Sequence, residues 1–462
     1  MTDITPVLSR ADQNLGSSLE NLFELLRIKS ISTDPAYKAD CRKAAEWLVA
    51  YLKTLDFEAS TRDTPGHPMV VAHHAGAGAD APHVLFYGHY DVQPVDPIEL
   101  WENDPFDPAV KEVENGRKIL TGRGTADDKG QLMTFVEACR AYKEVNGSLP
   151  CRITILFEGE EESGSPSLKP FLEANAAELK ADYALVCDTS MWDRDTPAIA
   201  AALRGLVGEE VVVTAADRDL HSGLFGGAAA NPIHVLTAAL AGLHDETGRI
   251  TLENFYDGVE ETPANIKASW EKLGQTAESF LGQVGLSVPS GEKGRSVLEL
   301  TWARPTAEVN GITGGYTGEG FKTVIAAKAS AKVSFRLVGK QDPDKIRETF
   351  RTYVRSKVPA DCSVEFHPHG GSPAIHLSYD SPVITKAKNA LSDEWPKPAV
   401  VIGMGGSIPI VGDFQRMLGM ESLLVGFGLS DDRIHSPNEK YELASYHKGI
   451  RSWVRILEAL AA

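Results

Sequence analysis

The chain has 462 residues, 42% of them hydrophobic and 24% charged, and a formal net charge of −18. A chain of this length is too long for a single hydrophobic core, so we expect two domains. The excess of negative charge argues against nucleic acid or an anionic membrane as a partner. No apolar run approaches the ~20 residues that a membrane-spanning helix needs.

The five cysteines are scattered along the chain and form no CxxC pair: Cys41, Cys139, Cys151, Cys187 and Cys362. An odd and dispersed set argues against a disulfide framework and against a thiolate metal site. The first residues contain neither a basic segment nor an apolar core, so we expect no signal peptide. We therefore expect a cytoplasmic protein.

In chain order, apolar residues at helical spacing over 19–26 and 44–55 predict two amphipathic helices. Short apolar runs predict buried strands at 84–87, 153–157, 183–187 and 422–427. Runs of this length between turn residues are typical of parallel sheets, whose strands are covered on both faces. Because helical patterns separate the first three runs, the sequence predicts a layered α/β domain with a mostly parallel central sheet.

The pattern changes near residue 205 and returns near residue 377. The intervening residues predict strands at 207–215, 323–338 (one strand or two) and 362–367, with helices at 232–243 and after 342. Two β-α-β-like halves of this kind predict a smaller, inserted α+β domain of the ferredoxin-like type. We therefore assign residues 1–203 and 377–462 to the larger domain and residues 204–376 to the inserted one.

Each of the four apolar runs is followed by residue types that bind metals: His89, Glu161 or Glu162, Asp188 and His435. Asp127 or Asp128, from the glycine-rich stretch 122–130, completes the set. In open α/β sheets ligands bind beyond the carboxyl ends of the strands, so we expect these side chains to converge. A set of nitrogen and oxygen donors without thiolate suits Zn²⁺, Mn²⁺ or Co²⁺.

The number of these side chains exceeds the roughly three protein ligands of one catalytic zinc ion, which predicts two ions that share a carboxylate. Of the adjacent acids Glu161 and Glu162, one can ligate while the other takes a proton from a water that bridges the ions. Asp91 is placed to accept the other ring N–H of His89. The pattern predicts metal-assisted hydrolysis, with an amide bond as the target.

The same stretches fit no nucleotide-binding motif, and each has a structural alternative. In residues 122–130 Asp127 stands where a dinucleotide fingerprint has its third glycine, and no Gly-Lys-Ser/Thr occurs. The acidic pair 127–128 alone would be a solvated turn, and His221 alone would be a capping or core histidine. The metal interpretation depends on all of the strand ends together.

Six motifs resemble the M20 metallopeptidase family, and within it the carnosinase-like dipeptidases. They are GHYDVQP at 88–94, GRGTADDKG at 122–130, EGEEESGS at 158–165, Asp188, RDLHSG at 218–223 and DRIHSPNE at 432–439. The resemblance implies two metal sites that share Asp127, one completed by His89 and Asp188 and the other by Glu162 and His435. The preference for Asp127 over Asp128 comes from the family pattern.

The resemblance also implies roles for residues beyond the ligands. Glu161 would be the general base, and Asp91 would orient His89. The larger domain would be catalytic, and the inserted one would be a lid that forms a homodimer. His221 would steady the substrate carbonyl, reaching the site of the partner subunit, and Arg336 would bind the terminal carboxylate of the substrate.

One loop departs from the family pattern. Relatives often have an acid and an arginine just before Gly-Gly-Ser, whereas Gly403 and Met404 precede Gly405 here. The backbone N–H groups of Gly406 and Ser407 remain candidates for binding the substrate carboxylate.

The sequence thus predicts a dipeptidase or short-peptide carboxypeptidase with two divalent ions per subunit, Zn²⁺ first and Mn²⁺ or Co²⁺ as alternatives. An N-acyl amino-acid deacylase is the nearest alternative function. A non-catalytic metal-binding relative is a further one, although the presence of Glu161 argues against it. We expect a small peptide as substrate and no partner of nucleic acid or membrane.

Overall fold

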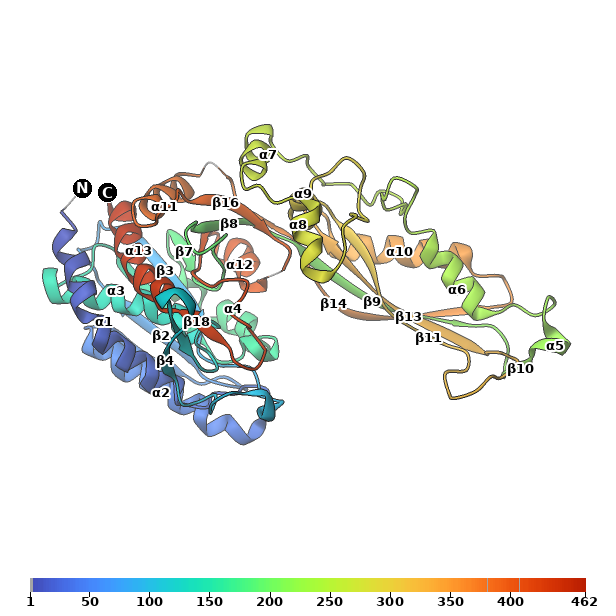
Figure 1. The fold of residues 1–462 in the computed structure, drawn as a ribbon, viewed down its shortest axis with the longest axis horizontal. Helices are drawn as coiled ribbons and strands as arrows, with labels where there is room; N and C mark the ends of the chain where they lie inside the picture. The colour runs from blue at the N-terminus through green and yellow to red at the C-terminus, as the bar shows by residue number, and fades with distance from the viewer. Residues whose placement is uncertain (1–2, 380, 407) are drawn as a thin grey trace. The chain divides into compact units, whose positions relative to one another are not determined.

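The structure, a computed structural model, describes residues 3–379, 381–406 and 408–462. The chain forms two units, whose elements Figure 1 shows in chain order. The first comprises Met1–Ala201, Leu377–Val401 and Ile410–Ala462, and the second comprises Ala202–His376 and Ile402–Pro409. The boundaries expected from sequence, 203/204 and 376/377, differ from this division chiefly in the segment 402–409.

Most strands of a nine-stranded mixed sheet belong to the first unit. Its order is β1-β2-β6-β3-β7-β17-β8-β15, and β16 also pairs with β8. The strands are β1 (Glu58–Arg62), β2 (Met69–His74), β3 (His83–His89), β6 (Arg152–Glu158), β7 (Tyr183–Val186), β8 (Ala198–Leu203), β15 (Ile375–His376), β16 (Val400–Met404) and β17 (Glu421–Val425).

Only the middle of this sheet is parallel. Strand β3 runs parallel to β6 and β7, and β7 runs parallel to β17. The outer pairs β1–β2, β2–β6, β17–β8 and β15–β8 are antiparallel. The four strands predicted from apolar runs are therefore the four parallel ones, which confirms the layered α/β fold and places the antiparallel pairs at the edges.

Helices cover the faces of this sheet. They are α1 (Thr5–Leu26), α2 (Lys38–Thr54), α3 (Lys129–Asn146), α4 (Leu168–Leu179), α11 (Pro382–Ser392), α12 (Pro409–Asp413) and α13 (Leu443–Ala461). Helices α1, α3 and α13 pack against one another and α11 packs against α13. The aromatic rings of Phe86 and Phe135 stack with centroids 3.8 Å apart, and Trp453 meets both edge-on. Strand β3 is thus anchored to α3 and α13 by close aromatic packing, which fixes where its carboxyl end lies.

A small antiparallel sheet joins two distant stretches of the first unit. Its order is β18-β5-β4, with β4 (Ala109–Glu112), β5 (Lys118–Thr121) and β18 (Lys440–Glu442). Strand β5 leads into the loop that carries Asp127, and β18 follows the loop that carries His435. Their pairing, with Lys440 opposite Thr121, holds the bases of these two loops together.

The second unit contains a four-stranded antiparallel sheet of order β11-β13-β9-β14. Its elements in chain order are β9 (Gly205–Thr214), α6 (Pro232–Ala241), β11 (Thr306–Gly314), β13 (Lys328–Leu337), α10 (Pro343–Lys357) and β14 (Ser363–Ser372). This chain order and spatial order are those of the ferredoxin-like fold, as predicted. Strand β9 alternates strictly between buried and half-buried residues, and Val207, Val211, Phe335 and Phe350 belong to the core that α6 and α10 share with the sheet.

Shorter elements complete both units. In the second they are β10 (Leu220–His221), α5 (Ser222–Phe225), α7 (Ala264–Glu271), α8 (Ala277–Leu281), α9 (Val297–Trp302) and β12 (Val324–Ile325). The long stretch predicted over 323–338 is therefore two strands, β12 and β13. In the part of the chain that the structure describes, no helix combines the length and the apolar composition needed to cross a membrane.

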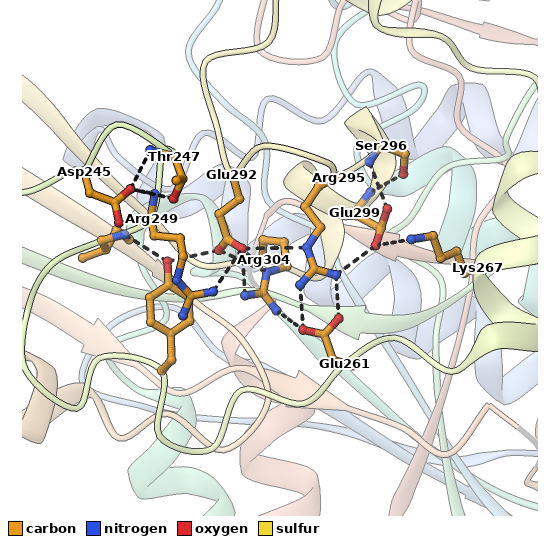
Figure 2. A network of polar contacts seen from close by, with 12 residues as sticks. Asp245, Thr247, Arg249, Glu261, Lys267, Glu292, Arg295, Ser296, Glu299 and Arg304 are labelled. Carbon is orange, nitrogen blue, oxygen red and sulfur yellow. Dashed lines mark hydrogen bonds and ion pairs between the residues drawn. The ribbon is translucent and has the colours of Figure 1, made fainter.

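An ion-pair network links residues within the long segment between α6 and β11 to one another (Figure 2). Arg304 and Glu292 form a pair of 2.9 Å, and both side chains are more than nine-tenths buried. Glu261 accepts from Arg295 at 2.6 Å, and Lys267 donates to Glu299 at 3.1 Å. Removing one partner of such a buried pair leaves an uncompensated charge, at a cost of about 3–5 kcal/mol. The network therefore has a structural role.

Candidate metal centre and active site

The parallel register of the central sheet brings predicted site residues to one edge of the first unit. Strand β3 ends at His89, and the register places His89 opposite Glu158, the last residue of β6. Glu161 and Glu162 follow in the short turn η4 (Glu161–Ser163). Asp188 comes two residues after the end of β7. All four strand ends point to the same edge because the strands are parallel.

Asp127 lies between the two histidines. Its Oδ1 is 3.0 Å from Nε2 of His89, and its Oδ2 is 2.9 Å from Nε2 of His435. His435 also reaches Oε2 of Glu162 at 3.2 Å. Donor atoms of His89, Asp127 and Glu162 all lie within 4.8 Å of one another. One carboxylate therefore presents a separate oxygen to each imidazole, which is the arrangement that a carboxylate shared by two ions requires.

The carboxyl group of Asp188 interacts electrostatically with this cluster. Burial raises the pKa of Asp188 well above its usual value, and the carboxylate of Asp127 raises it further. Among the described residues the Asp188 carboxylate has no hydrogen bond to the other four predicted ligands. The structure thus brings four of these residues into direct contact and places Asp188 close enough for its charge to be felt.

Glu161 sits among like charges. Burial raises the pKa of the Glu161 carboxyl, and the charges of Glu162 and Asp127 add to the effect, while His89 opposes it. A carboxylate with a raised pKa is a stronger proton acceptor. This environment suits a general base that does not itself ligate.

Asp91 supports two parts of the site. Its Oδ1 is 3.5 Å from Nδ1 of His89, the contact expected from sequence, and its backbone oxygen is 3.2 Å from the same nitrogen. Its carboxylate also accepts the backbone N–H groups of Glu161 at 3.3 Å and of Glu162 at 3.0 Å. Sequence reasoning did not predict this second role, which fixes the turn that presents both glutamates.

Asp128 and Gln93 have contacts that sequence reasoning missed. Asp128 is buried, and its Oδ2 accepts the backbone N–H of His89 at 3.1 Å, so the second acid of the pair supports the strand end instead of facing the imidazoles. Gln93 donates from Nε2 to Oε2 of Glu162 at 2.7 Å. The only signal for Gln93 was its place in the motif of His89.

The loop that carries His435 adopts an uncommon backbone. Arg433, His435 and Asn438 all have left-handed φ angles, between 56° and 62°. Such residues cost about 1–3 kcal/mol each and persist where their surroundings hold them. Asn438 helps to fix the conformation of this loop. Its side chain accepts a hydrogen bond from the backbone N–H of Glu102 at 2.8 Å and donates one to the backbone oxygen of Leu100 at 2.9 Å.

The donor set fits divalent cations. Hydrogen bonds to Asp127 and then to Glu162 raise the pKa of His435 to about 10. Burial lowers the pKa of His89, but its partners Asp127 and Asp91 outweigh burial and raise it well above the usual value. Both shifts show that the cluster stabilises positive charge at this place. Imidazoles and carboxylates without thiolate are ligands of Zn²⁺, Mn²⁺ and Co²⁺.

The predicted substrate-binding residues belong to the second unit. His221 ends β10, is exposed, and its Nδ1 accepts the N–H of Gly223 at 3.0 Å, so it caps α5 in the way that the structural alternative describes. Arg336 lies in β13, and Gly406 lies in the segment Ile402–Pro409. Ser407 lies outside the described residues. The roles of these residues in substrate binding stay predictions.

Arg204 is a further residue of this region that sequence reasoning missed. Its Nε donates to the oxygen of Gly405 at 3.2 Å. Burial, and after it the positive charge of Arg336, lowers the pKa of Arg204 to about 10. Two arginines near the Gly405 loop give this part of the second unit an excess of positive charge.

Comparison with known proteins gives consistent matches over nearly the whole chain. The sequence model of peptidase family M20/M25/M40 matches residues 85–459. The Cys-Gly metallodipeptidase DUG1 of Candida albicans is 29% identical over 468 residues, which cover 97% of this chain and 96% of the relative.

Two solved structures are similar over equally long stretches. The M20 family metallo-carboxypeptidase Sso-CP2 from Sulfolobus solfataricus has a TM-score of 0.80 and 30% identity, and the match covers 96% of this chain and 99% of the other. The structure of human carnosine dipeptidase 1 has a TM-score of 0.78 and 25% identity, over 100% and 99% of the two chains.

Proposed function

This chain belongs to peptidase family M20/M25/M40 and is a metallopeptidase, and from that premise we propose that it cleaves the amide bond of dipeptides or short peptides. The observation that carries the proposal is the position of Asp127, whose two oxygens each face a different histidine. That geometry, together with the excess of carboxylates around it, supports a hydrolase with two metal ions.

We assign the ligands to two sites that share Asp127. His89 and Asp188 complete one site, and Glu162 and His435 complete the other. When bound, two divalent ions would supply Lewis-acid activation of the attacking water and of the scissile carbonyl. Zn²⁺ fits these donors first, and Mn²⁺ and Co²⁺ are alternatives.

Glu161 has the role of general base in this proposal. It accepts a proton from the attacking water and returns it to the leaving amine, as a carboxylate of raised pKa can do in both directions. Asp91 holds the Glu161–Glu162 turn through two backbone N–H groups and orients His89 at the same time. One buried carboxylate thus holds the proton acceptor and two of the five ligands, Glu162 and His89.

The second unit supplies the binding of the substrate carboxylate. Arg336 and the neighbouring Arg204 provide positive charge, and the backbone N–H of Gly406 provides a further donor. The positive charge of Arg336, which together with burial lowers the pKa of Arg204, supports the binding of an anion there. A free carboxylate at the end of a dipeptide or of an N-acyl amino acid meets this requirement.

A substrate panel tests this function and separates it from the alternatives. We expect chelation to abolish hydrolysis and added Zn²⁺ or Mn²⁺ to restore it, with dipeptides such as Cys-Gly and β-Ala-His cleaved faster than N-acetyl amino acids. Release of free amino acid, followed by chromatography, gives kcat/KM for each. Faster cleavage of the N-acyl compounds would make the chain a deacylase, and no turnover by fully metal-loaded protein would make it a non-catalytic relative.

We propose that the inserted unit forms a homodimer. Strand β11 is an edge of its sheet and exposes Val309 and Ile312, and Phe321 nearby in sequence is 91% exposed. An edge strand with exposed apolar side chains is a template for pairing with another chain. In the dimer His221 would reach the site of the partner subunit and steady the substrate carbonyl.

Mixing two inactive variants tests whether His221 acts across the dimer. In a heterodimer of His221→Ala and Glu161→Gln subunits, one of the two sites has both residues intact. Random assembly from equal amounts should therefore restore about a quarter of wild-type activity, since half of the symmetric dimers are mixed. Differently tagged subunits verify the mixing, and verified heterodimers without activity would show that His221 does not act in the partner's site.

A further inference from the structure

One buried carboxylate lies at the base of the loop that carries Asp127. Glu439 is fully buried, and its Oε1 accepts the backbone N–H groups of Ala126 at 2.9 Å and of Asp127 at 3.2 Å. Its Oε2 accepts the N–H of Gly124 at 3.0 Å and a hydrogen bond from Arg123 at 2.8 Å. Four donors thus converge on one side chain, three of them backbone groups of a single loop.

Arg123 extends this contact to the loop that follows His89. It is buried, and its Nη2 donates to the backbone oxygen of Pro94 at 3.0 Å. Its guanidinium also lies 5.3 Å from the ring centre of Trp101. Glu439 neutralises this arginine, so neither charge is buried without a partner.

The backbone of Glu439 belongs to a third loop, the one that carries His435. Its oxygen accepts the N–H of Gly122 at 3.2 Å. The loops of His89, Asp127 and His435 therefore meet at the pair Arg123–Glu439. These loops come from distant parts of the sequence, and this pair joins all three of them.

We propose that Glu439 is a positioning residue that aligns the three ligand-bearing loops and so sets the affinity of the chain for its metal ions. The inference rests on the ligands assigned under the proposed function. Glu439 acts on the metal sites indirectly, through the backbone of Asp127, because its carboxylate is hydrogen-bonded to other groups of the protein. Groups that orient metal ligands in this way change metal affinity by about 10–100-fold when replaced.

A glutamine at this position keeps the size of the side chain but replaces one acceptor oxygen with an N–H₂ donor. Two or more of the four donors then lose their acceptor, and Arg123 loses its counter-charge. The loop of Asp127 is expected to shift away from the two imidazoles, with a loss of affinity at both ion sites.

Glu442 offers a matched control. It is also a buried glutamate paired with arginines, accepting from Arg117 at 2.8 Å and from Arg194 at 3.4 Å. It lies only three residues further along the chain, yet it has no hydrogen bond to the loop of Asp127 among the described residues. The arginine partners of Glu442 are partly exposed, so Glu442→Gln reports the cost of breaking the ion pairs of a buried carboxylate, without the effect on the ligand loops.

The experiment measures Zn²⁺ affinity of the metal-free chain by competition with a chromophoric chelator, and its Tm without metal. We expect Glu439→Gln to bind Zn²⁺ about 10–100-fold more weakly than wild type, and Glu442→Gln to stay within about twofold, while the Tm without metal gives the loss of stability in each variant. Co²⁺-loaded protein gives a second readout, because its visible spectrum changes with ligand geometry.

The outcomes separate this inference from the function it rests on. Wild-type Zn²⁺ affinity in folded Glu439→Gln would overturn the positioning role, and so would equal losses of affinity in both variants. If Glu439→Gln does not fold, Glu439→Asp carries the comparison, since it keeps the charge one methylene short, and unchanged affinity there would overturn the role. A wild-type chain that binds none of Zn²⁺, Mn²⁺ and Co²⁺ would instead refute the proposed function.

Discussion

Glu161→Gln is expected to keep its metal ions and to lose about 10²–10⁴-fold in kcat, the usual contribution of a general base. The glutamine has the same shape but does not accept a proton at neutral pH. Burial and the neighbouring charges raise the pKa of Glu161, which is the proton acceptor. The substitution leaves unchanged the four carboxylates and imidazoles that are in contact at Asp127. Steady-state kinetics with the best dipeptide of the panel gives kcat, and elemental analysis gives the metal content.

Glu162→Gln is the matched control, because the two glutamates are adjacent and differ in their contacts. Oε2 of Glu162 lies 3.2 Å from Nε2 of His435, and its loss should lower metal content as well as activity. A Glu161→Gln protein that lost metal, or that kept wild-type kcat, would reverse the roles assigned to this pair.

Asp127→Asn is expected to have the largest effect of all substitutions in the chain. The amide offers one oxygen where the carboxylate offers two, so the group shared by both ion sites is broken. The N–H₂ group would face one of the two imidazoles at a distance set by the present 2.9–3.0 Å contacts. Since enzymes owe at least ~10⁶-fold acceleration to their sites, we expect a residual kcat/KM below about 10⁻⁴ of wild type.

Asp128→Asn provides the comparison within the same acidic pair. The Asp128 side chain accepts the N–H of His89 at 3.1 Å, and an asparagine oxygen can accept the same hydrogen bond. We therefore expect it to keep its metal and to lose no more than about tenfold in kcat/KM, the equivalent of one ordinary hydrogen bond. An inactive Asp128→Asn beside an active Asp127→Asn would mean that the bridge has been assigned to the wrong acid.

The difference between these two acids shows where sequence reasoning ends. Apolar runs and turn residues are local signals, and they were enough to find the four parallel strands and to place His89, Glu161, Glu162 and Asp188 at strand ends. Asp127 and Asp128 are equivalent in any local pattern, and only the resemblance favoured the first. The physical reason is non-local, because the loop conformation that turns Asp127 towards the imidazoles depends on Glu439, 312 residues further along the chain.

Other features of the fold had no local signal either. Strands β1, β2, β8 and β15 pair antiparallel at the edges of the sheet, and pairing direction depends on the path of the chain, which single runs do not encode. The second role of Asp91 is a contact between side chain and backbone across 70 residues. His221 caps α5, and a capping histidine and a substrate-binding one look alike in sequence.

The central claim is that two metal ions share Asp127, and the most direct measurement is anomalous diffraction from crystals of the wild-type protein grown with Zn²⁺. The account predicts two peaks per subunit, one beside each oxygen of Asp127, with His89 and Asp188 at the first and Glu162 and His435 at the second. A single peak, or peaks that contact none of these carboxylates, would contradict it.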